Sequence, residues 1–193
     1  MTAANSPLGA HMSGDANKAD RLCRLFCNVI DEIITARALA AVEGEDISRA
    51  QFQGLQFIYL HPMCCIKDLA EGLDVSHPAA VKLVERIEAK GYITRSAYEP
   101  DRRIVQLQVS PEGEALSRQV IEARNQAIDN VLSRLGAPAS CDLLRCLEKF
   151  VMAALEDQKD MDGVCLHCGG THVDTCPVCQ AEYAVTGEMR RDS

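Results

Sequence analysis

The apolar residues of this chain recur at two different intervals, and the order of those intervals restricts the fold. Between positions 48 and 91 they recur every three or four residues, which predicts helices that each bury one face. Between positions 92 and 109 apolar and polar residues alternate, as at Val105, Leu107 and Val109, which predicts a β-hairpin. The helical interval returns from position 110. We therefore expect a mainly α fold with one small β-hairpin.

Capping and helix-breaking residues indicate where the helices begin and end. Ser48 with Gln51 has the form of a capping box, and Ser110 followed by Pro111 is typical of a helix start. Gly72, Gly91 and Gly136 each follow an apolar stripe and predict a helix end. The expected helices span Leu22 to about Ala41, Ser48 to His61, Cys64 or Cys65 to Glu71, Ser76 to Gly91, Ser110 to Leu135, and Ser140 to Ala154.

The two ends of the chain differ in composition from this helical body. Residues 1–16 lack periodicity and predict a disordered lead-in, within which 9–12 (Gly-Ala-His-Met) look like a cloning remnant. We expect one domain over 17–155, a charged linker over 156–164, a small cysteine-rich module over 165–183 and a tail over 184–193. No apolar run approaches the ~20 residues of a membrane span, and no export signal precedes residue 17, so a cytoplasmic protein without membrane contact is expected.

The net charge of −8 argues against an indiscriminate binder of nucleic acid or of anionic membranes. One segment departs from this average. Between Ser76 and Ser110 six basic residues face four acidic ones, which gives +2. The basic residues are Lys82, Arg86, Lys90, Arg95, Arg102 and Arg103, and the acidic ones are Glu85, Glu88, Glu99 and Asp101. Any anionic partner is expected to bind here.

The elements in this basic segment form a recognisable combination. Two short helices joined by a tight turn and followed by a hairpin describe a winged helix-turn-helix, whose second helix enters the major groove of double-stranded DNA. Lys82, Arg86 and Lys90 alone would be typical of a solvated helix face with Glu85 and Glu88 as neighbours. The hairpin beside them favours DNA binding, while a protein-docking role of the winged helix stays open.

Five segments resemble the MarR family of bacterial transcription regulators over roughly residues 20–155. These segments are 66–70, 75–76, 83–93, 101–107 and 110–113. The resemblance implies a two-fold homodimer, held by its first and last two helices, that binds a pseudo-palindromic operator, commonly as a repressor. It also implies release or retuning by a small molecule, a metal or an oxidant. The reading unit would span about residues 48–110.

The same resemblance assigns the residues that would contact DNA. They are Ser76, His77, Ala79, Lys82 and Arg86 on the recognition helix, and Arg95, Asp101, Arg102 and Arg103 on the wing. Asp101 would orient Arg103, whose guanidinium suits a narrow minor groove. Many relatives carry Ser or Thr where this chain has Pro78, Ala79 and Val81, so direct base reading is expected to be sparse.

Four cysteines near the end have metal-ligand spacing. Cys165-x2-Cys168 and Cys176-x2-Cys179 are separated by seven residues, which would bring two thiolate pairs around one ion. We expect tetrahedral zinc, with iron as the rival metal, in a module that resembles a zinc ribbon or rubredoxin. Four protein ligands leave no open coordination position, and no catalytic constellation is recognisable, so an enzyme is not expected. The metal would either fold the tail or sense metal or redox state.

Six further cysteines have less defined roles. Cys64 and Cys65 stand at a predicted helix start, where the thiol pKa can be lowered, and form the candidate thiol switch. The remaining four, Cys23, Cys27, Cys141 and Cys146, are interpreted as buried free cysteines or as a second metal or thiol site. A small-molecule effector between the dimer helices and the reading unit is equally compatible. The alternative function is a metal-handling or electron-transfer protein whose winged helix docks a protein.

Overall fold

The computed structural model describes residues 7–42, 47–98, 101–168 and 173–188 of the 193-residue chain. They form a mainly helical fold with one antiparallel hairpin, as the sequence predicts. In chain order the elements are α1 (Pro7–Asn28), η1 (Val29–Thr35), α2 (Ala36–Ala40), α3 (Arg49–Leu60), α4 (Ile66–Gly72), α5 (His77–Ala89), β1 (Ile93–Tyr98), β2 (Asp101–Val109), α6 (Pro111–Leu135), α7 (Ala137–Ala154), α8 (Gln158–Cys168) and α9 (Pro177–Thr186). None of the helices in these ranges is long and apolar enough to cross a membrane.

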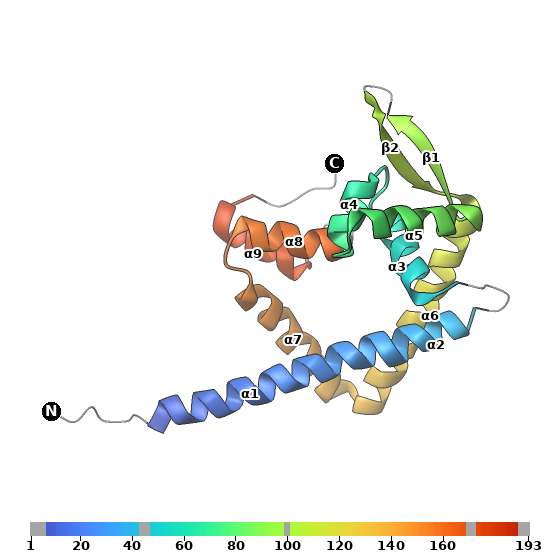
Figure 1. The fold of residues 1–193 in the computed structure, drawn as a ribbon. Coiled ribbons are helices and arrows are strands. Elements are labelled where there is room, and N and C mark those ends of the chain that lie inside the picture. Colours follow the sequence, from blue (N-terminus) through green and yellow to red (C-terminus); the bar gives the residue numbers. More distant parts are fainter. Residues whose placement is uncertain (1–6, 43–46, 99–100, 169–172, 189–193) are drawn as a thin grey trace.

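The first three helical elements form one continuous helix that crosses the molecule on the side away from the hairpin (Figure 1). Its middle part, η1, is π-helical, and the Thr35 hydroxyl donates a hydrogen bond of 3.0 Å to the carbonyl of Ile30, five residues back. The helix begins at Pro7, so residues 7–16 are helical where the sequence predicts a disordered lead-in. Residues 14–21 are exposed, and a helical segment that buries no face needs no apolar stripe that periodicity could reveal.

The reading unit is built on one core that α3, α4, α5 and the hairpin share. Its fully buried side chains are Phe52, Leu55, Ile58, Leu69, Val84, Ile87, Ile93 and Leu107. The predicted capping box starts α3: the Ser48 hydroxyl accepts from the Gln51 amide, and the Gln51 side chain accepts from the Ser48 amide. Arg49, in the next position, forms ion pairs with Asp31 and Glu32 of η1. These pairs connect the reading unit to the long N-terminal helix.

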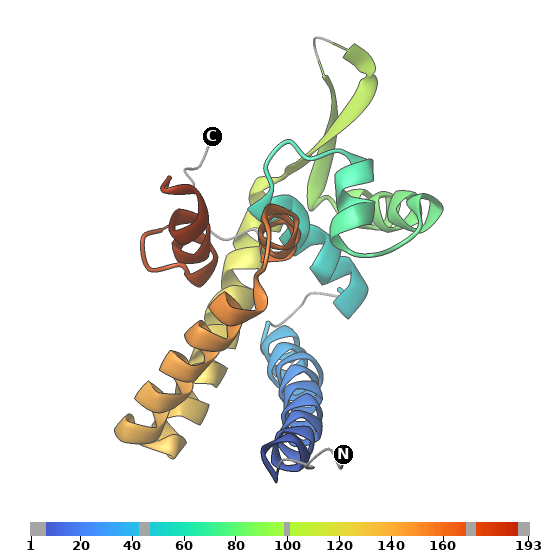
Figure 2. The ribbon, with the colours of Figure 1, turned by 90° about the vertical axis from the view of Figure 1, so that its left-hand side faces the viewer.

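A single serine joins the hairpin to α6. Ser110 follows β2 directly; its hydroxyl donates to the carbonyl of Gly91 (2.6 Å) and accepts from the amide of Gly113 (3.0 Å). Its own amide donates to the carbonyl of Tyr92 (2.9 Å). The start of the hairpin and the start of α6 are thereby fixed to each other, and α6 leads away from the reading unit as one leg of the molecule (Figure 2).

The C-terminal segment is helical where the sequence predicts a linker. Between Ala154 and Cys168 only Leu155–Asp157 are non-helical, and α8 starts at Gln158. The acidic residues that resemble a linker bond to the backbone at this helix start: Asp157 accepts from the Asp160 amide (2.9 Å), and Asp160 accepts from the Glu156 amide (3.0 Å). The predicted sixth helix also begins earlier, at Ala137.

Gly113 is expected to tolerate no side chain. A Cβ at this position would lie 2.1 Å from the carbonyl oxygen of Tyr92, which is backbone and cannot move aside alone. We expect Gly113→Ala to lower the free energy of unfolding by about 1–3 kcal/mol, measured by urea denaturation followed by circular dichroism. The matched control is Gly163→Ala in α8, where a Cβ meets nothing within 4 Å. There, stability should stay or rise by up to about 1 kcal/mol. Equal stability of Gly113→Ala and the parent chain would contradict the close contact.

Candidate nucleic-acid interface

Helix α5 has one completely buried face and one exposed face. Ala80, Val84 and Ile87 on the inner face are 0% exposed. The residues predicted to contact DNA on this helix lie on the outer side and are exposed: Ser76, His77, Ala79, Lys82 and Arg86. Pro78 lies in the first turn, where a missing amide hydrogen costs nothing. The helix therefore presents a row of polar and small residues, with two cations, to a partner.

The turn that precedes α5 is held by a close contact behind it. Gly72 ends α4, and a Cβ there would lie 2.0 Å from the ring of Phe57 in α3. Asp74 has the left-handed backbone conformation (φ 51°), and the amide of Val75 donates to the carbonyl of Ala70 (3.0 Å). This packing fixes the angle between α4 and α5, and with it the direction in which the exposed face of α5 points.

Arg95 has a carboxylate partner on the recognition helix. Its Nε atom lies 2.8 Å from Oε2 of Glu88, and its side chain is only 28% exposed. Strand β1 and the end of α5 are thereby joined by opposite charges. In this arrangement Arg95 holds the hairpin against α5, and its predicted contact with DNA stays a prediction.

The other predicted wing residues belong to strand β2. Asp101 starts the strand and pairs across the hairpin with Tyr98, next to an irregularity in the register between Ala97 and Tyr98. Arg102 and Arg103 follow in the same strand. Their side chains, with that of Asp101, lie outside the described residues, so the orientation of the Arg103 guanidinium stays a prediction.

Cys64 and Cys65 pack against the hairpin as a short extended segment. The carbonyl of Cys64 accepts from the amide of Leu107 (2.8 Å), and Cys65 forms an isolated bridge with Gln106. Cys64 is buried, and its burial, reinforced by the nearby Asp68 and Cys65, raises its thiol pKa from 9.0 to about 12. The expectation of a lowered pKa is therefore wrong for Cys64, because desolvation outweighs any effect of the short helix α4. Cys65 is half-buried, and its amide donates to Asp68 (2.8 Å).

The four cysteines of the predicted metal module fall into two places. Cys165, Cys176 and Cys179 lie around the contact between α8 and α9: the thiols of Cys176 and Cys179 are hydrogen-bonded, and Cys165 lies close enough to act on the Cys179 charge. Burial, with both neighbours, raises the pKa of Cys179 to about 11. Cys168 instead lines a cavity against α3 and α4. Among the described residues, no group of three or more potential ligands is arranged to hold a metal ion as it stands.

Comparisons with known proteins agree on one family. The MarR family model matches residues 45–104. The transcriptional regulator YwhA of Bacillus subtilis is 35% identical over 96 residues, which are 50% of this chain and 69% of that protein. The chain belongs to the MarR family. The transcriptional repressor MdtR, also of Bacillus subtilis, is 25% identical over 136 residues, covering 70% of this chain and 88% of the repressor.

The MarR fold is also seen in a solved structure with bound DNA. FabT of Streptococcus pneumoniae in complex with DNA has a TM-score of 0.58 to this chain, with 21% identity over 72% of this chain and 99% of FabT. None of the three proteins named is described as metal-handling or electron-transferring, so the alternative function finds no support in them.

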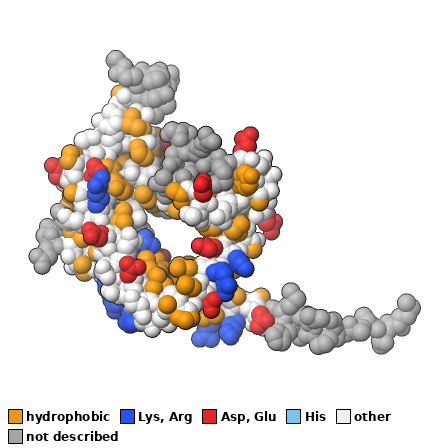
Figure 3. Space-filling model, turned by 180° about the vertical axis from the view of Figure 1, so that it is seen from behind, with side chains coloured by type: hydrophobic (Ala, Val, Ile, Leu, Met, Phe, Trp, Pro, Cys, Tyr) orange, Lys and Arg blue, Asp and Glu red, His pale blue; other side chains and the backbone are white. Residues whose placement is uncertain are grey.

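In this MarR chain, the long helices leave an apolar surface uncovered. Helix α7 contains no buried residue, and α1 with η1 exposes several large apolar side chains. They are Leu22 (55%), Leu25 (51%), Phe26 (43%), Val29 (42%) and Ile33 (40%), with Leu144 (48%) and Phe150 (58%) on α7. Figure 3 shows apolar side chains gathered beside the hollow at the centre of the rear face, with basic side chains along the lower edge. A surface of this kind is typical of an interface.

Several contacts that position the exposed face of α5 and the hairpin could not be predicted from the sequence. The pairs Arg95–Glu88 and Gly72–Phe57, and the strand-like pairing of Cys64, each join residues from different elements. The opposite charges of Arg95 and Glu88 are visible in the sequence, but nothing there shows that they meet. The four cysteines Cys23, Cys27, Cys141 and Cys146 are exposed in the single chain, contrary to the interpretation as buried thiols.

The raised pKa of Cys64 predicts that this thiol is unreactive in the folded protein. A thiol with a pKa near 12 holds about a thousandfold less thiolate at neutral pH than one with a pKa of 9.0, and thiolate is the nucleophile. Iodoacetamide should therefore label Cys64 in a Cys65→Ser protein only after unfolding, as counted by mass spectrometry. The reciprocal Cys64→Ser protein, labelled at the half-buried Cys65, is the control. Rapid labelling of native Cys64 would contradict its burial.

Proposed function

We propose that this chain is a transcription repressor that binds a pseudo-palindromic DNA operator as a homodimer. The observation that carries the proposal is the exposed face of α5, with Lys82 and Arg86, beside a hairpin that Arg95 holds against the same helix. A helix with one buried and one exposed face fits the major groove of DNA, and a hairpin next to it reaches the neighbouring DNA backbone or minor groove. The resemblance to the repressor MdtR and to FabT, a DNA-bound protein, supports the proposal.

The uncovered helices support the homodimer. Helix α7 has no buried residue, so its apolar side chains stay exposed or only partly covered in a single chain. Figure 2 shows α6 and α7 on one side and α1 on the other, below the reading unit. A second copy packed on these helices by a two-fold axis would bury the same residues on both chains. It would also place two α5 helices for half-sites about one helical turn, roughly 34 Å, apart on the duplex.

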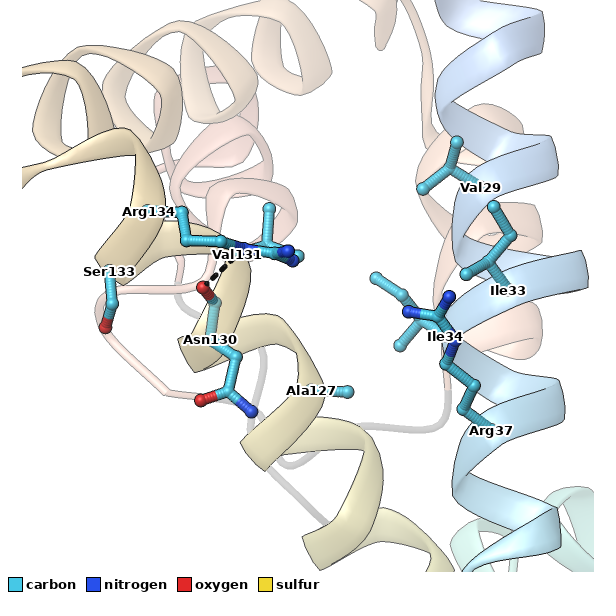
Figure 4. A pocket seen from close by; sticks show the side chains of 9 residues that line it. All are labelled: Val29, Ile33, Ile34, Arg37, Ala127, Asn130, Val131, Ser133 and Arg134. Atoms are coloured by element: carbon cyan, nitrogen blue, oxygen red, sulfur yellow. Dashed lines mark hydrogen bonds between the residues drawn. The ribbon is translucent and has the colours of Figure 1, made fainter.

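A cavity between the N-terminal helix and α6 is the proposed place for a small-molecule signal. It has a volume of about 770 Å³ and is lined by Val29, Ile33 and Ile34 on one side. Arg37 and Arg134 point into the same space from opposite helices (Figure 4). Apolar walls with two guanidinium groups suit a small organic acid with an apolar body. Because the π-helical η1 forms one wall, a ligand here would act on the helix that Arg49 connects to the reading unit.

The DNA-reading part of the proposal predicts a loss of binding for Arg86→Ala. Fragments selected by the protein from genomic DNA supply the operator. If Arg86 neutralises one phosphate per protomer, affinity should fall and the slope of log affinity against log salt should become shallower by about one unit per protomer. If Arg86 contacts a base edge, the difference in binding free energy between the preferred base pair and the other base pairs at that position should fall by about 1–3 kcal/mol. Lys159→Ala, an exposed cation in the first turn of α8, is the control and should change neither quantity. An unchanged Arg86→Ala protein would contradict the role of α5.

The homodimer predicts a specific effect of Phe26→Glu. Phe26 is 43% exposed in the single chain, and the substitution would place one unpaired carboxylate per chain in the apolar contact. We expect the dimer to weaken by about 3 kcal/mol or more, roughly a hundredfold, measured by light scattering across a dilution series. Val185→Glu on α9, at a side chain 68% exposed, should leave the dimer intact. A dimer that withstands Phe26→Glu but not Val185→Glu would place the interface elsewhere.

A further inference from the structure

The last turn of α8 contacts the part of the reading unit that positions α5. Leu166 packs against the core of the reading unit, and His167 and Cys168 line a cavity of about 330 Å³. The opposite walls of this cavity include Phe57 in α3 and His61 just after it. They also include Gly72 and Leu73 at the end of α4. Gly72 and Phe57 are the residues whose close contact fixes the turn before α5. The last turn of α8 therefore lies beside the packing that positions the recognition helix.

The other three tail cysteines lie on the α9 side of the same turn. Cys165 and Cys176 pack against the apolar cluster of Met161, Val178 and Ala181, and Cys179 is hydrogen-bonded to Cys176. This cluster also contacts Val151 and Leu155, so α8 and α9 share a small apolar contact beside the cysteines.

The α8–α9 contact that contains Cys165 and the cavity that Cys168 lines are separated by one turn of α8. Cys168 follows Cys165 by three residues in α8, so the two side chains differ by only about 60° around the helix axis. Zinc is usually held by four ligands, and the described residues do not gather these cysteines into one ligand group as they stand. A turn of the last α8 residues would bring Cys168 toward the other three cysteines. The same movement would remove Cys168 from the cavity beside α3 and α4.

We propose that one zinc ion binds Cys165, Cys168, Cys176 and Cys179, and that recruiting Cys168 changes the contact between α8 and the base of α5, so that zinc controls DNA binding. The ion replaces four thiol protons, which are released to solvent, and no electron is transferred. This inference rests on the proposed function for its readout, but the metal site itself does not. By linkage, zinc and operator DNA must alter each other's affinity by the same factor.

Two measurements on the full-length reduced protein test the metal site. Cobalt(II), substituted for zinc, should give one ion per chain with the absorption of a tetrahedral four-thiolate complex, and zinc should displace it. In Cys168→Ser the same titration should show a three-thiolate complex with weaker binding. Zinc should also protect Cys168, which is exposed in the structure, from alkylation. The matched control is Cys146→Ser, an exposed cysteine on α7, which should behave as the parent chain.

Operator binding with and without zinc tests the coupling. We expect zinc to change the affinity at least about fivefold in the parent chain and in Cys146→Ser, and less than twofold in Cys168→Ser. A four-thiolate complex without any change in operator affinity overturns the coupling. Purified protein that holds iron overturns the choice of zinc, and a disulfide between Cys176 and Cys179 with no metal uptake overturns the site. A protein that binds zinc but no DNA fragment overturns the proposed function, and the cobalt spectrum then decides the metal site alone.

Discussion

The exposed face of α5 is usable only because the opposite face is packed without gaps. Ala80, Val84 and Ile87 are completely buried, and α3 approaches so closely that a Cβ at Gly54 would lie 2.8 Å from Leu83. A Cβ at Gly72 would meet the Phe57 ring in the same way. With glycine at both close approaches, α3, α4 and α5 have little freedom to shift relative to each other. The direction of the recognition helix and the position of the hairpin both depend on this packing.

Features set by a few neighbouring residues could be predicted from the sequence. The capping box of Ser48, the proline start after Ser110 and the alternation around Leu107 each act within one element, and the structure confirms all three. Contacts between elements were not predictable, because periodicity shows which face is buried but not against what. The pairing of Cys64 with β2 is an example: the sequence places a cysteine at a helix start, and only the fold shows that the Leu107 amide binds its carbonyl and that its thiol is buried.

The C-terminal segment shows how one sequence pattern fits two local structures. Acidic residues between 156 and 162 suggest a solvated linker, yet Asp157 and Asp160 accept backbone hydrogen bonds at the start of α8. Likewise, Cys-x2-Cys is the spacing of a metal knuckle, but residues three apart also share one side of a helix. Cys165 and Cys168 have that helical spacing in α8. Spacing alone could therefore propose the four ligands, while their separation into two places required the fold.

The charge distribution supports the proposed homodimer. The chain carries −8 overall, Arg95 is balanced by Glu88, and Lys82 and Arg86 are the cations on the outer side of α5 among its predicted DNA contacts. Electrostatic affinity grows with the number of phosphates neutralised, so each reading unit contributes a small share. Two units joined rigidly double that number, because binding of the first unit places the second at its half-site. In the proposed homodimer, the apolar helices that join the copies would therefore contribute to DNA affinity although they do not touch DNA.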